Sequence, residues 1–410
     1  MMEEKKKRKS LHINIDTTGL VGMFKFALSD KRRDRVIRHA PIKEITAEFA
    51  INKHAKAQHP DALHLRVAEI IDMPAAGAKK IVLASENGED LPYFRAGQYL
   101  SLRFHINGST ATRAYSICSS PAMAKHGIYA VTVRAVKDGF VSDYVLNHLQ
   151  RGDMVVASAP EGQFYYEPVR DARTVVAIAG GSGITPFLSM AYAIEQKIED
   201  FNLILLYGAR TKDSLLFYEE LETIRSHTDR VKPVYILSEE ECEGFEHGFI
   251  SAELIRKYAP WGDYSVFLCG PEGLYSYEAD ELKKLQIPAR RIRQELQSVV
   301  KCVSCRPDYP ADCAGKTFTL TLHRWGETFT IPCLADEPIL VAIERAGIVT
   351  PSRCRNGSCG WCRSKLLAGD VYVPSESEAR RWGDREFGYI HPCCSFPVSD
   401  VEVDVPGETE

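Results

Sequence analysis

Residues 354–362 read CRNGSCGWC, and another cysteine, Cys393, follows farther along the chain. Cys354, Cys359 and Cys362 are therefore spaced as C-x4-C-x2-C. With one outlying cysteine this is the plant-type spacing, in which four thiolates hold the two irons of a 2Fe-2S cluster. The stretch predicts a small iron–sulfur domain in the last quarter of the chain.

The residues between these cysteines suit a loop that wraps closely around a cluster. Gly357 and Gly360 carry no side-chain bulk, and backbone N–H groups in such a loop are free to bond to the sulfurs. Zinc is the alternative metal. Zinc ribbons usually pair two C-x2-C knuckles, however, so the spacing favours the cluster.

The composition is that of a globular protein of several domains. The chain has 410 residues, which predicts roughly two to four domains. Hydrophobic residues make up 45% and charged residues 26%, which excludes a disordered, collagenous or coiled-coil chain. The formal net charge of -4 gives no overall attraction to nucleic acid, so we expect no nucleic-acid partner.

The first residues, MMEEKKKRKS, lead into no apolar region of a secretory signal, which predicts a cytoplasmic protein. Most of the 12 cysteines follow residue 300. In a large chain of this kind, closely spaced cysteines more often bind metal or carry out redox chemistry than form structural disulfides.

Residues 174–194 contain no charge and are long enough to cross a bilayer. Gly180, Gly181, Gly183 and Pro186 interrupt them, however, and divide them into a β-branched run, a glycine turn and a helical pattern. We interpret the segment as a buried strand, a turn and a helix, and the chain as not an integral membrane protein.

The hydrophobic pattern changes along the chain and predicts a multidomain protein. Short β-branched runs indicate an antiparallel β-barrel, strands alternating with helices indicate an α/β doubly wound parallel sheet, and a smaller α+β region holds the cysteine motif. The expected boundaries are an N-terminal extension 1–60, the barrel 61–168, the α/β domain 169–297, a cysteine-bearing connector 298–315 and the cluster domain 316–410.

The N-terminal extension is basic, with KKKRK and KRRDR around the apolar stretch GLVGMFKFAL. A solvated tail and an amphipathic helix that docks on a membrane or a partner both fit this pattern. The sequence assigns the extension no role.

The barrel carries residues that suit a flavin. A flavin needs a cation for its phosphates, an aromatic face for its ring and a hydroxyl near N5, the atom that receives hydride. The strand RAYSICSSP offers Arg113, Tyr115 and Ser116. Farther on, DGFVSDYVLNHL predicts a helix whose first free N–H groups can bind a diphosphate; these residues are Gly139, Phe140, Val141 and Ser142.

The α/β region carries residues that suit a dinucleotide. GGSGITP connects a strand to a helix, as a phosphate-binding turn requires, although it lacks the G-x-G-x-x-G pattern. Ligands bind at the carboxyl ends of parallel strands, where YGAR and CGP also fall. The candidate residues are Gly181, Ser182, Gly183, Ile184, Thr185, Arg210, Cys269, Gly270 and Pro271.

In this order, the motifs of residues 61–297 resemble the ferredoxin-NADP reductase superfamily. Residues 316–406 resemble a plant-type ferredoxin domain of the β-grasp type, in TFTLTLHRWGETFTIP, ILVAIERAGI, the cysteine loop and HPCCSFPVSDVEVDV. The whole chain is similar to fused members of the superfamily, among them the phthalate dioxygenase and hybrid-cluster-protein reductases.

The resemblance implies roles for the candidate residues. The barrel residues bind the flavin, the glycine turn binds the dinucleotide, and Ser116 and Cys269 lie at the reacting nicotinamide and flavin. Cys393 becomes the fourth cluster ligand, because Pro397, Ser399 and Asp400 after it fall in the register of the ferredoxin domain. Its neighbour Cys394 is adjacent and could exchange roles with it.

Charge and the resemblance both bear on the choice between NADH and NADPH and between FAD and FMN. NADPH-selective members commonly place a Ser-Arg pair where this chain reads Ser238-Glu239. A carboxylate repels a 2'-phosphate but accepts hydrogen bonds from a ribose hydroxyl, so NADH is favoured over NADPH, although Arg210 leaves a route to phosphate binding. The phosphate loop favours FAD. Phthalate dioxygenase reductase uses FMN, which stays an alternative.

The connector carries Cys302, Cys305 and Cys313, with Cys333 nearby in the sequence. C-x2-C is a metal knuckle, so a second metal site is one interpretation. A linker with incidental thiols is favoured, because no second knuckle follows.

The sequence therefore predicts an NADH-dependent flavin and iron–sulfur reductase. Electrons would pass from NADH through the flavin and the 2Fe-2S cluster to an external protein acceptor, such as an oxygenase, a hybrid-cluster protein or another metalloenzyme. The alternative is a noncatalytic electron-transfer or redox-sensing subunit of a larger complex. The sequence does not identify the acceptor.

Overall fold

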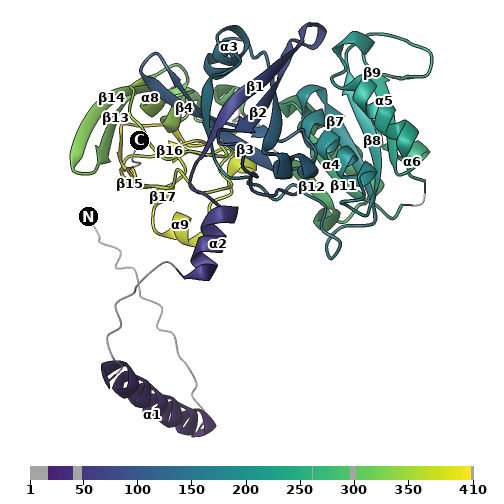
Figure 1. Cartoon of the computed structure of the whole chain (residues 1–410). Helices are drawn as coiled ribbons and strands as arrows, with labels where there is room; N and C mark the ends of the chain where they lie inside the picture. Colours follow the sequence, from purple (N-terminus) through teal and green to yellow (C-terminus); the bar gives the residue numbers. More distant parts are fainter. Residues whose placement is uncertain (1–16, 40–48, 261, 296–301, 408–410) are drawn as a thin grey trace. The chain divides into compact units, whose positions relative to one another are not determined.

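The computed structural model describes residues 17–39, 49–260, 262–295 and 302–407. The chain forms two compact units, Met1–Lys53 and His54–Glu410. Figure 1 shows the elements of both, coloured along the sequence.

Two helices, α1 (Thr17–His39) and α2 (Ala50–Gln58), occupy the described parts of the N-terminal extension. The basic stretch KKKRK lies outside the described residues, whereas KRRDR lies within α1. None of the helices in the described ranges combines the length and the hydropathy needed to cross a membrane.

The expected barrel is an antiparallel sheet of six strands in the order β4-β3-β6-β1-β2-β5. An isolated bridge between Ile117 and Val131 links the ends of the strand order. Alternating side chains such as Leu65 and Val67 fill its interior, as the two-residue period of a strand dictates. The strands are β1 (Leu63–Met73), β2 (Ala78–Ser85), β3 (Tyr99–Ile106), β4 (Ser109–Ser116), β5 (Ile128–Arg134) and β6 (Met154–Ala157).

Helix α3 (Phe140–Asn147) follows β5 and contributes Val141 and Val145 to the barrel core. The 3-10 turns η1 (Pro74–Ala76) and η2 (Pro121–His126) connect neighbouring strands. The packing of α3 fixes the position of its first turn, which the sequence predicted to face a diphosphate.

The α/β domain is the predicted doubly wound parallel sheet, in the order β10-β9-β8-β7-β11-β12. Successive residues of β7 point to opposite faces: Val175 and Ala177 lie in one apolar cluster, Val176 and Ile178 in another. The strands are β7 (Thr174–Gly180), β8 (Asn202–Ala209), β9 (Val231–Leu237), β10 (Glu246–His247), β11 (Ser265–Cys269) and β12 (Ile292–Glu295).

Helices cover both faces of this sheet. Helices α4 (Thr185–Glu195) and α5 (Tyr218–His227) pack on one face, and α6 (Ala252–Tyr258) and α7 (Glu272–Leu285) pack on the other. The chain runs outward from β7 to β10 and then returns to β11 beside β7, so the order reverses between β7 and β11. Ligands of such sheets bind at this reversal.

The uncharged segment 174–194 is the predicted strand, turn and helix: β7, the 3-10 turn η3 (Gly181–Ile184) and α4. It is buried because β7 lies in the middle of the sheet and α4 covers it, which explains a hydropathy that resembles a membrane span.

The C-terminal domain is the predicted α+β fold. Its main sheet has the order β14-β13-β19-β15-β17, with β13 and β19 parallel. A second pair, β16-β18, lies apart from it. The elements are β13 (Thr317–Arg324), β14 (Glu327–Leu334), α8 (Ile339–Arg345), β15 (Ser364–Ala368), β16 (Val371–Tyr372), η8 (Ser375–Ser377), α9 (Trp382–Glu386), β17 (Tyr389–Ile390), β18 (Phe396–Pro397) and β19 (Val401–Asp404).

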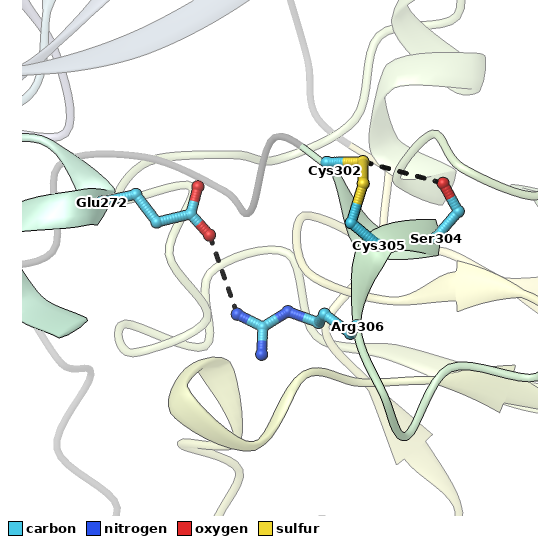
Figure 2. Close-up of a disulfide and its surroundings, with 5 residues drawn as sticks. All are labelled: Glu272, Cys302, Ser304, Cys305 and Arg306. Atoms are coloured by element: carbon cyan, nitrogen blue, oxygen red, sulfur yellow. Dashed lines mark hydrogen bonds and ion pairs between the residues drawn. A yellow bond between two sulfur atoms is a disulfide. The ribbon is translucent and has the colours of Figure 1, made fainter.

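The described part of the connector, from residue 302, differs from both interpretations of its cysteines. Cys302 and Cys305 are joined by a disulfide on the turn η6 (Val303–Cys305), shown in Figure 2. A bridged sulfur offers a metal no thiolate, so the second metal site is wrong for this pair. Cys313 ends the turn η7 (Ala311–Cys313) and is buried.

A substitution of Gly183 tests the packing at the place where the strand order reverses between β7 and β11. A Cβ there would lie 2.0 Å from the carbonyl oxygen of Cys269, a backbone atom with little freedom to move. We expect Gly183→Ala to destabilise the α/β domain by about 1–3 kcal/mol or more and to lower Tm by about 5 °C or more. Gly273→Ala is the control, since a Cβ there meets nothing within 4 Å. Equal Tm values for the two variants in a thermal melt would contradict this account.

Candidate electron-transfer site

One cavity of about 1220 Å³ receives side chains from the barrel, the α/β domain and the C-terminal domain. It lies at the carboxyl ends of β7 and β11, where the strand order reverses. The three groups of predicted residues therefore meet at one place.

The barrel side of the cavity contains every residue predicted to bind the flavin. Arg113, Tyr115 and Ser116 project from β4, and Gly139, Phe140, Val141 and Ser142 form the start of α3. Burial raises the pKa of Tyr115 to about 12, so its phenol stays neutral beside a bound ring. The cation, the aromatic face, the hydroxyl and the helix start share one wall.

Gly139 is required at the start of α3 by close packing. A Cβ there would lie 2.3 Å from Ser142 Oγ and 2.9 Å from the carbonyl oxygen of Val136. The Ser142 hydroxyl donates a hydrogen bond to the Gly139 carbonyl oxygen at 3.1 Å. The N-terminal end of α3 thus approaches the cavity with little side-chain bulk, which suits a phosphate.

The predicted dinucleotide turn divides into residues that line the cavity and residues that support them. Gly181, Ser182 and Thr185 line it, whereas Gly183 and Ile184 are buried in the fold. Gly181 adopts a left-handed φ of 53°. The Thr185 hydroxyl donates to the Ser182 carbonyl oxygen at 2.9 Å, which fixes the turn.

Cys269 lies behind the wall of the cavity. Gly270 and Pro271 line it, but the Cys269 side chain is buried and does not belong to the lining. Burial raises the pKa of the Cys269 thiol well above its ordinary value, and Tyr275 interacts with it. Its predicted place beside the reacting nicotinamide stays a prediction.

The predicted nucleotide selector lies at the rim. Arg210 and Ser238 line the cavity, whereas Glu239 does not. Glu239 forms an ion pair with Arg210, with 3.6 Å between Oε1 and Nε, and both side chains are exposed. A carboxylate held against Arg210 reduces the positive charge available to a 2'-phosphate.

The four predicted ligand cysteines come together. The Cys354 thiol is in hydrogen-bonding contact with the thiols of Cys359 and Cys393, and the Cys393 thiol also contacts that of Cys362. These contacts hold the pKa of the Cys354 thiol below its ordinary value. The Cys394 thiol contacts that of Cys393 and is directed to the carbonyl oxygens of residues 377 and 391.

Within the described ranges, no group of three or more His, Cys, Asp or Glu side chains is arranged around a single metal ion. The four thiols form one chain of contacts, Cys359 with Cys354, Cys354 with Cys393 and Cys393 with Cys362. Four thiolates with this C-x4-C-x2-C spacing are the donor set for two irons, so the contacting thiols fit a 2Fe-2S cluster better than one zinc ion.

The loop around these thiols has the backbone geometry that a cluster requires. The N–H groups of Cys359 and Trp361 point at the sulfurs of Cys354 and Cys359, each with 3.4 Å between nitrogen and sulfur. Gly357 and Gly360 have φ values of 85° and 71°, which favour glycine. Hydrogen bonds of this kind stabilise a cluster and raise its potential.

An ion-pair network joins two parts of the cavity. One is the flavin wall, the residues of β4 and the start of α3 that are predicted to bind the flavin, and the other is the cluster loop, residues 354–362. Glu344 of α8 lies between two cations, with its Oε2 3.4 Å from Arg113 Nη1 and its Oε1 2.5 Å from Arg355 Nη1. Arg353, next to Cys354, pairs with Glu161 of the barrel. Cys354 and Arg355 line the same cavity as the flavin residues.

Several residues of the cavity were not predicted. Arg134 ends β5, and its guanidinium lies against the glycine turn, where a Cβ at Gly181 would be 2.3 Å from Nη1. Its place at the end of a strand in the flavin region was a usable signal. Glu278 and Glu295 also line the cavity, and burial raises the pKa of each to about 8. Glu278 lies on an amphipathic helix and Glu295 on a short strand, and neither position gave a signal in the sequence that it would line a cavity.

Three known domain families match this chain, one for each of its three domains. The oxidoreductase FAD-binding domain matches residues 58–166, the oxidoreductase NAD-binding domain matches residues 177–279, and the 2Fe-2S iron-sulfur cluster binding domain matches residues 323–398. The ferredoxin reductase component of 3-ketosteroid-9-alpha-monooxygenase from Mycobacterium tuberculosis is 31% identical over 83% of this chain and 95% of its own length.

The chain belongs to the ferredoxin-NADP reductase superfamily, in the form fused to a C-terminal 2Fe-2S domain. One component of the 1,2-phenylacetyl-CoA epoxidase of Escherichia coli is 30% identical over 76% of this chain and 88% of its own length. Phthalate dioxygenase reductase, a solved structure, matches with a TM-score of 0.61 and 25% identity over 84% of this chain and 98% of that one.

Membership in this superfamily confirms the predicted fold class, the cofactor domains and the general activity. The chain is an NAD(P)H-dependent flavin oxidoreductase with an FAD-binding domain, an NAD-binding domain and a 2Fe-2S domain in that order. The roles of individual residues stay predictions.

Glu278 gives the free energy of unfolding a pH dependence that can be tested. Its side chain is 0% exposed and neither carboxyl oxygen has a hydrogen-bond partner, so burial, followed by the charge of Glu281, raises its pKa from 4.5 to about 8. The folded chain keeps a proton that the unfolded chain releases. Glu278 therefore lowers the free energy of unfolding as pH rises through this window.

We expect Glu278→Gln to raise Tm by about 3 °C more at about pH 8.5 than at about pH 6, because glutamine cannot ionise. Glu281→Gln is the control on the same helix. Glu281 accepts the Ala252 N–H and pairs with Lys284, so its substitution should lower Tm. A Glu278→Gln gain that is equal at the two pH values would contradict the buried, protonated state.

Proposed function

We propose that this chain takes electrons from NADH and passes them through FAD and a 2Fe-2S cluster to an external protein acceptor, an oxygenase or another metalloenzyme. The observation that carries the proposal is the cavity shared by the flavin wall, the dinucleotide turn and the cluster loop. A bound flavin accepts hydride and releases electrons one at a time. The chain supplies placement and electrostatics.

Each wall of the cavity has a part in binding. We assign the flavin ring to Tyr115 and Ser116, and its phosphates to Arg113 and the start of α3. A diphosphate there meets both the N–H groups of a helix N-terminus and the guanidinium of Arg134, which supports FAD over FMN. Cys354, Cys359, Cys362 and Cys393 are the proposed cluster ligands.

NADH is the proposed reductant. The turn from Gly181 to Thr185 would bind its diphosphate, with Gly270 and Pro271 against the nicotinamide. The ion pair of Arg210 with Glu239 supports this choice, because the carboxylate opposes the guanidinium that a 2'-phosphate would use. Serine hydroxyls such as that of Ser238 can instead bond to a ribose hydroxyl.

An oxygenase is the favoured acceptor class, since the named relatives are components of a monooxygenase and an epoxidase. We further propose that the chain works in the cytoplasm, where NADH is formed and used. A noncatalytic subunit is less favoured, because Gly181, Gly270 and Pro271 keep the nucleotide side of the cavity open.

An anaerobic titration tests the function. We expect NADH to bleach the flavin and cluster absorbance together, complete at about 1.5 equivalents per chain, because a flavin takes two electrons and a 2Fe-2S cluster takes one. NADPH should reduce the protein far more slowly. Cys359→Ser is the control, with an end point near one equivalent. A protein that holds both cofactors and is bleached by neither nucleotide would contradict the proposal.

Glu344 tests the contact between the flavin wall and the cluster loop. Glu344→Ala leaves Arg113 and Arg355 as neighbouring cations with no carboxylate between them, a loss of about 3–5 kcal/mol for a buried pair. We expect cytochrome c reduction, which requires the cluster, to fall at least about tenfold, while ferricyanide reduction by the flavin changes less than about twofold.

The matched control for this variant is Glu402→Ala. Glu402 pairs with His323 within the C-terminal sheet and does not line the cavity. Equal loss of both activities in Glu344→Ala would show a general folding defect. Unchanged cytochrome c reduction would show that the ion-pair network is not needed for electron transfer from the flavin to the cluster.

A further inference from the structure

The connector carries the disulfide between Cys302 and Cys305, which neither the cofactors nor the nucleotide uses. The two cysteines are three positions apart on η6, with 5.4 Å between their Cα atoms. Figure 2 shows the bridge. Both residues are exposed, so the bridge is open to a reagent or a protein in solution. Cys313 of the same connector is buried, whereas Cys242 and the other free thiols lie in other parts of the described fold.

A structural role explains this bridge poorly. Stabilisation by a disulfide grows with the length of the loop it closes, and this loop is very short. Val303 between the two cysteines is 0% exposed and packs with Tyr309, Cys313, Ala335 and Phe396, so this one residue of the turn is anchored whether or not the bridge is closed. An exposed C-x2-C pair is instead the arrangement of a redox-active dithiol.

The disulfide turn positions Arg306. The Arg306 N–H donates to the Val303 carbonyl oxygen at 3.1 Å, and the Cys305 N–H donates to that of Cys302 at 3.2 Å. The backbone of Arg306 therefore belongs to the hydrogen-bonded turn that the bridge closes.

Arg306 links two domains. Its Nη2 lies 3.7 Å from Glu272 Oε1 at the start of α7. Figure 2 shows this ion pair, and Arg306 also pairs with Glu376 of η8 in the C-terminal domain. Glu272 directly follows Pro271 of the cavity wall. The turn thus joins the nucleotide side of the cavity to the domain of the cluster.

We propose that Cys302 and Cys305 form a thiol–disulfide exchange site, whose substrate is a dithiol, and that its reduction slows electron transfer from the flavin to the cluster. The second part rests on the proposed function. Opening the bridge releases the Cys302 end of the turn, and the placement of Arg306 between Glu272 and Glu376 is then less restricted.

The exchange balances without another reactant. One thiolate of the donor attacks a sulfur of the bridge, forms a mixed disulfide and releases the other cysteine as a thiolate. The second donor thiolate then breaks the mixed disulfide, and the donor leaves as a disulfide. Two electrons pass to Cys302 and Cys305, which also take up two protons. In a reducing cytoplasm such a bridge is transient and not structural.

The test uses the holoprotein, equilibrated anaerobically in mixtures of reduced and oxidised dithiothreitol. Alkylation followed by peptide mass analysis measures the fraction of Cys302 and Cys305 that is reduced, and the visible spectrum confirms that the cluster is retained. Activity is measured as the ratio of NADH-driven cytochrome c reduction to ferricyanide reduction. We expect this ratio to fall at least about threefold as the pair is reduced, and to recover on reoxidation.

Three variants isolate the cause. The double variant C302S/C305S should have the low ratio and no response to dithiothreitol. Arg306→Gln should also have the low ratio, although its disulfide still exchanges. Cys242→Ser, which alters a partly exposed free thiol of the α/β domain, should behave as the wild type.

Two results would overturn the proposal: a pair that resists dithiothreitol in the folded protein, or an activity ratio that does not change when the pair is reduced. Failure of the proposed function is distinguishable, since the protein would then reduce neither acceptor with NADH in either state of the disulfide.

Discussion

The carboxylate of Glu344 holds together the two parts of the protein between which an electron must pass. It lies between Arg113 of the flavin wall and Arg355 of the cluster loop, and its own side chain is 9% exposed. Without this carboxylate, Arg113 and Arg355 would face each other as uncompensated cations at the boundary of the barrel and the C-terminal domain. Electron transfer slows steeply with distance. Transfer from the flavin to the cluster therefore depends on this contact between the two domains.

The remaining architecture brings the nucleotide to the same place. The reversal of strand order between β7 and β11 leaves a crevice at the carboxyl ends of these strands, and the barrel closes it with β4 and the start of α3. Glycines allow the backbone to approach a ligand there, while Arg134 adds positive charge beside the turn. Binding surfaces from three domains thereby form one cavity, although no domain alone encloses it.

Local patterns were sufficient to predict the parts of the fold and the motifs that meet at the cavity. The cysteine spacing around Gly357, the glycine turn after β7 and the strand of Arg113 each depend on neighbouring residues, so the sequence contains them directly. The charge-free segment 174–194 was assigned correctly because its glycines fall between two different periodicities.

Contacts between distant residues could not be predicted in this way. Nothing near Glu344 in the sequence indicates that Arg113 and Arg355 approach it from both sides. The burial of Cys269 behind the cavity wall is likewise a result of tertiary packing, and its predicted place beside the nicotinamide stays a prediction. Cys302 and Cys305 were weighed as a metal knuckle or as incidental thiols, and the choice of a disulfide depends on backbone geometry that spacing alone does not contain.

The central claim is that the electron passes from the flavin to the cluster within one chain. Anaerobic rapid mixing with NADH, followed in the flavin and cluster absorbance bands over about a twentyfold range of protein concentration, tests it most directly. The account predicts that the cluster is reduced after the flavin with a first-order rate constant that does not depend on protein concentration. A rate constant that rises in proportion to concentration would show transfer between molecules and contradict it.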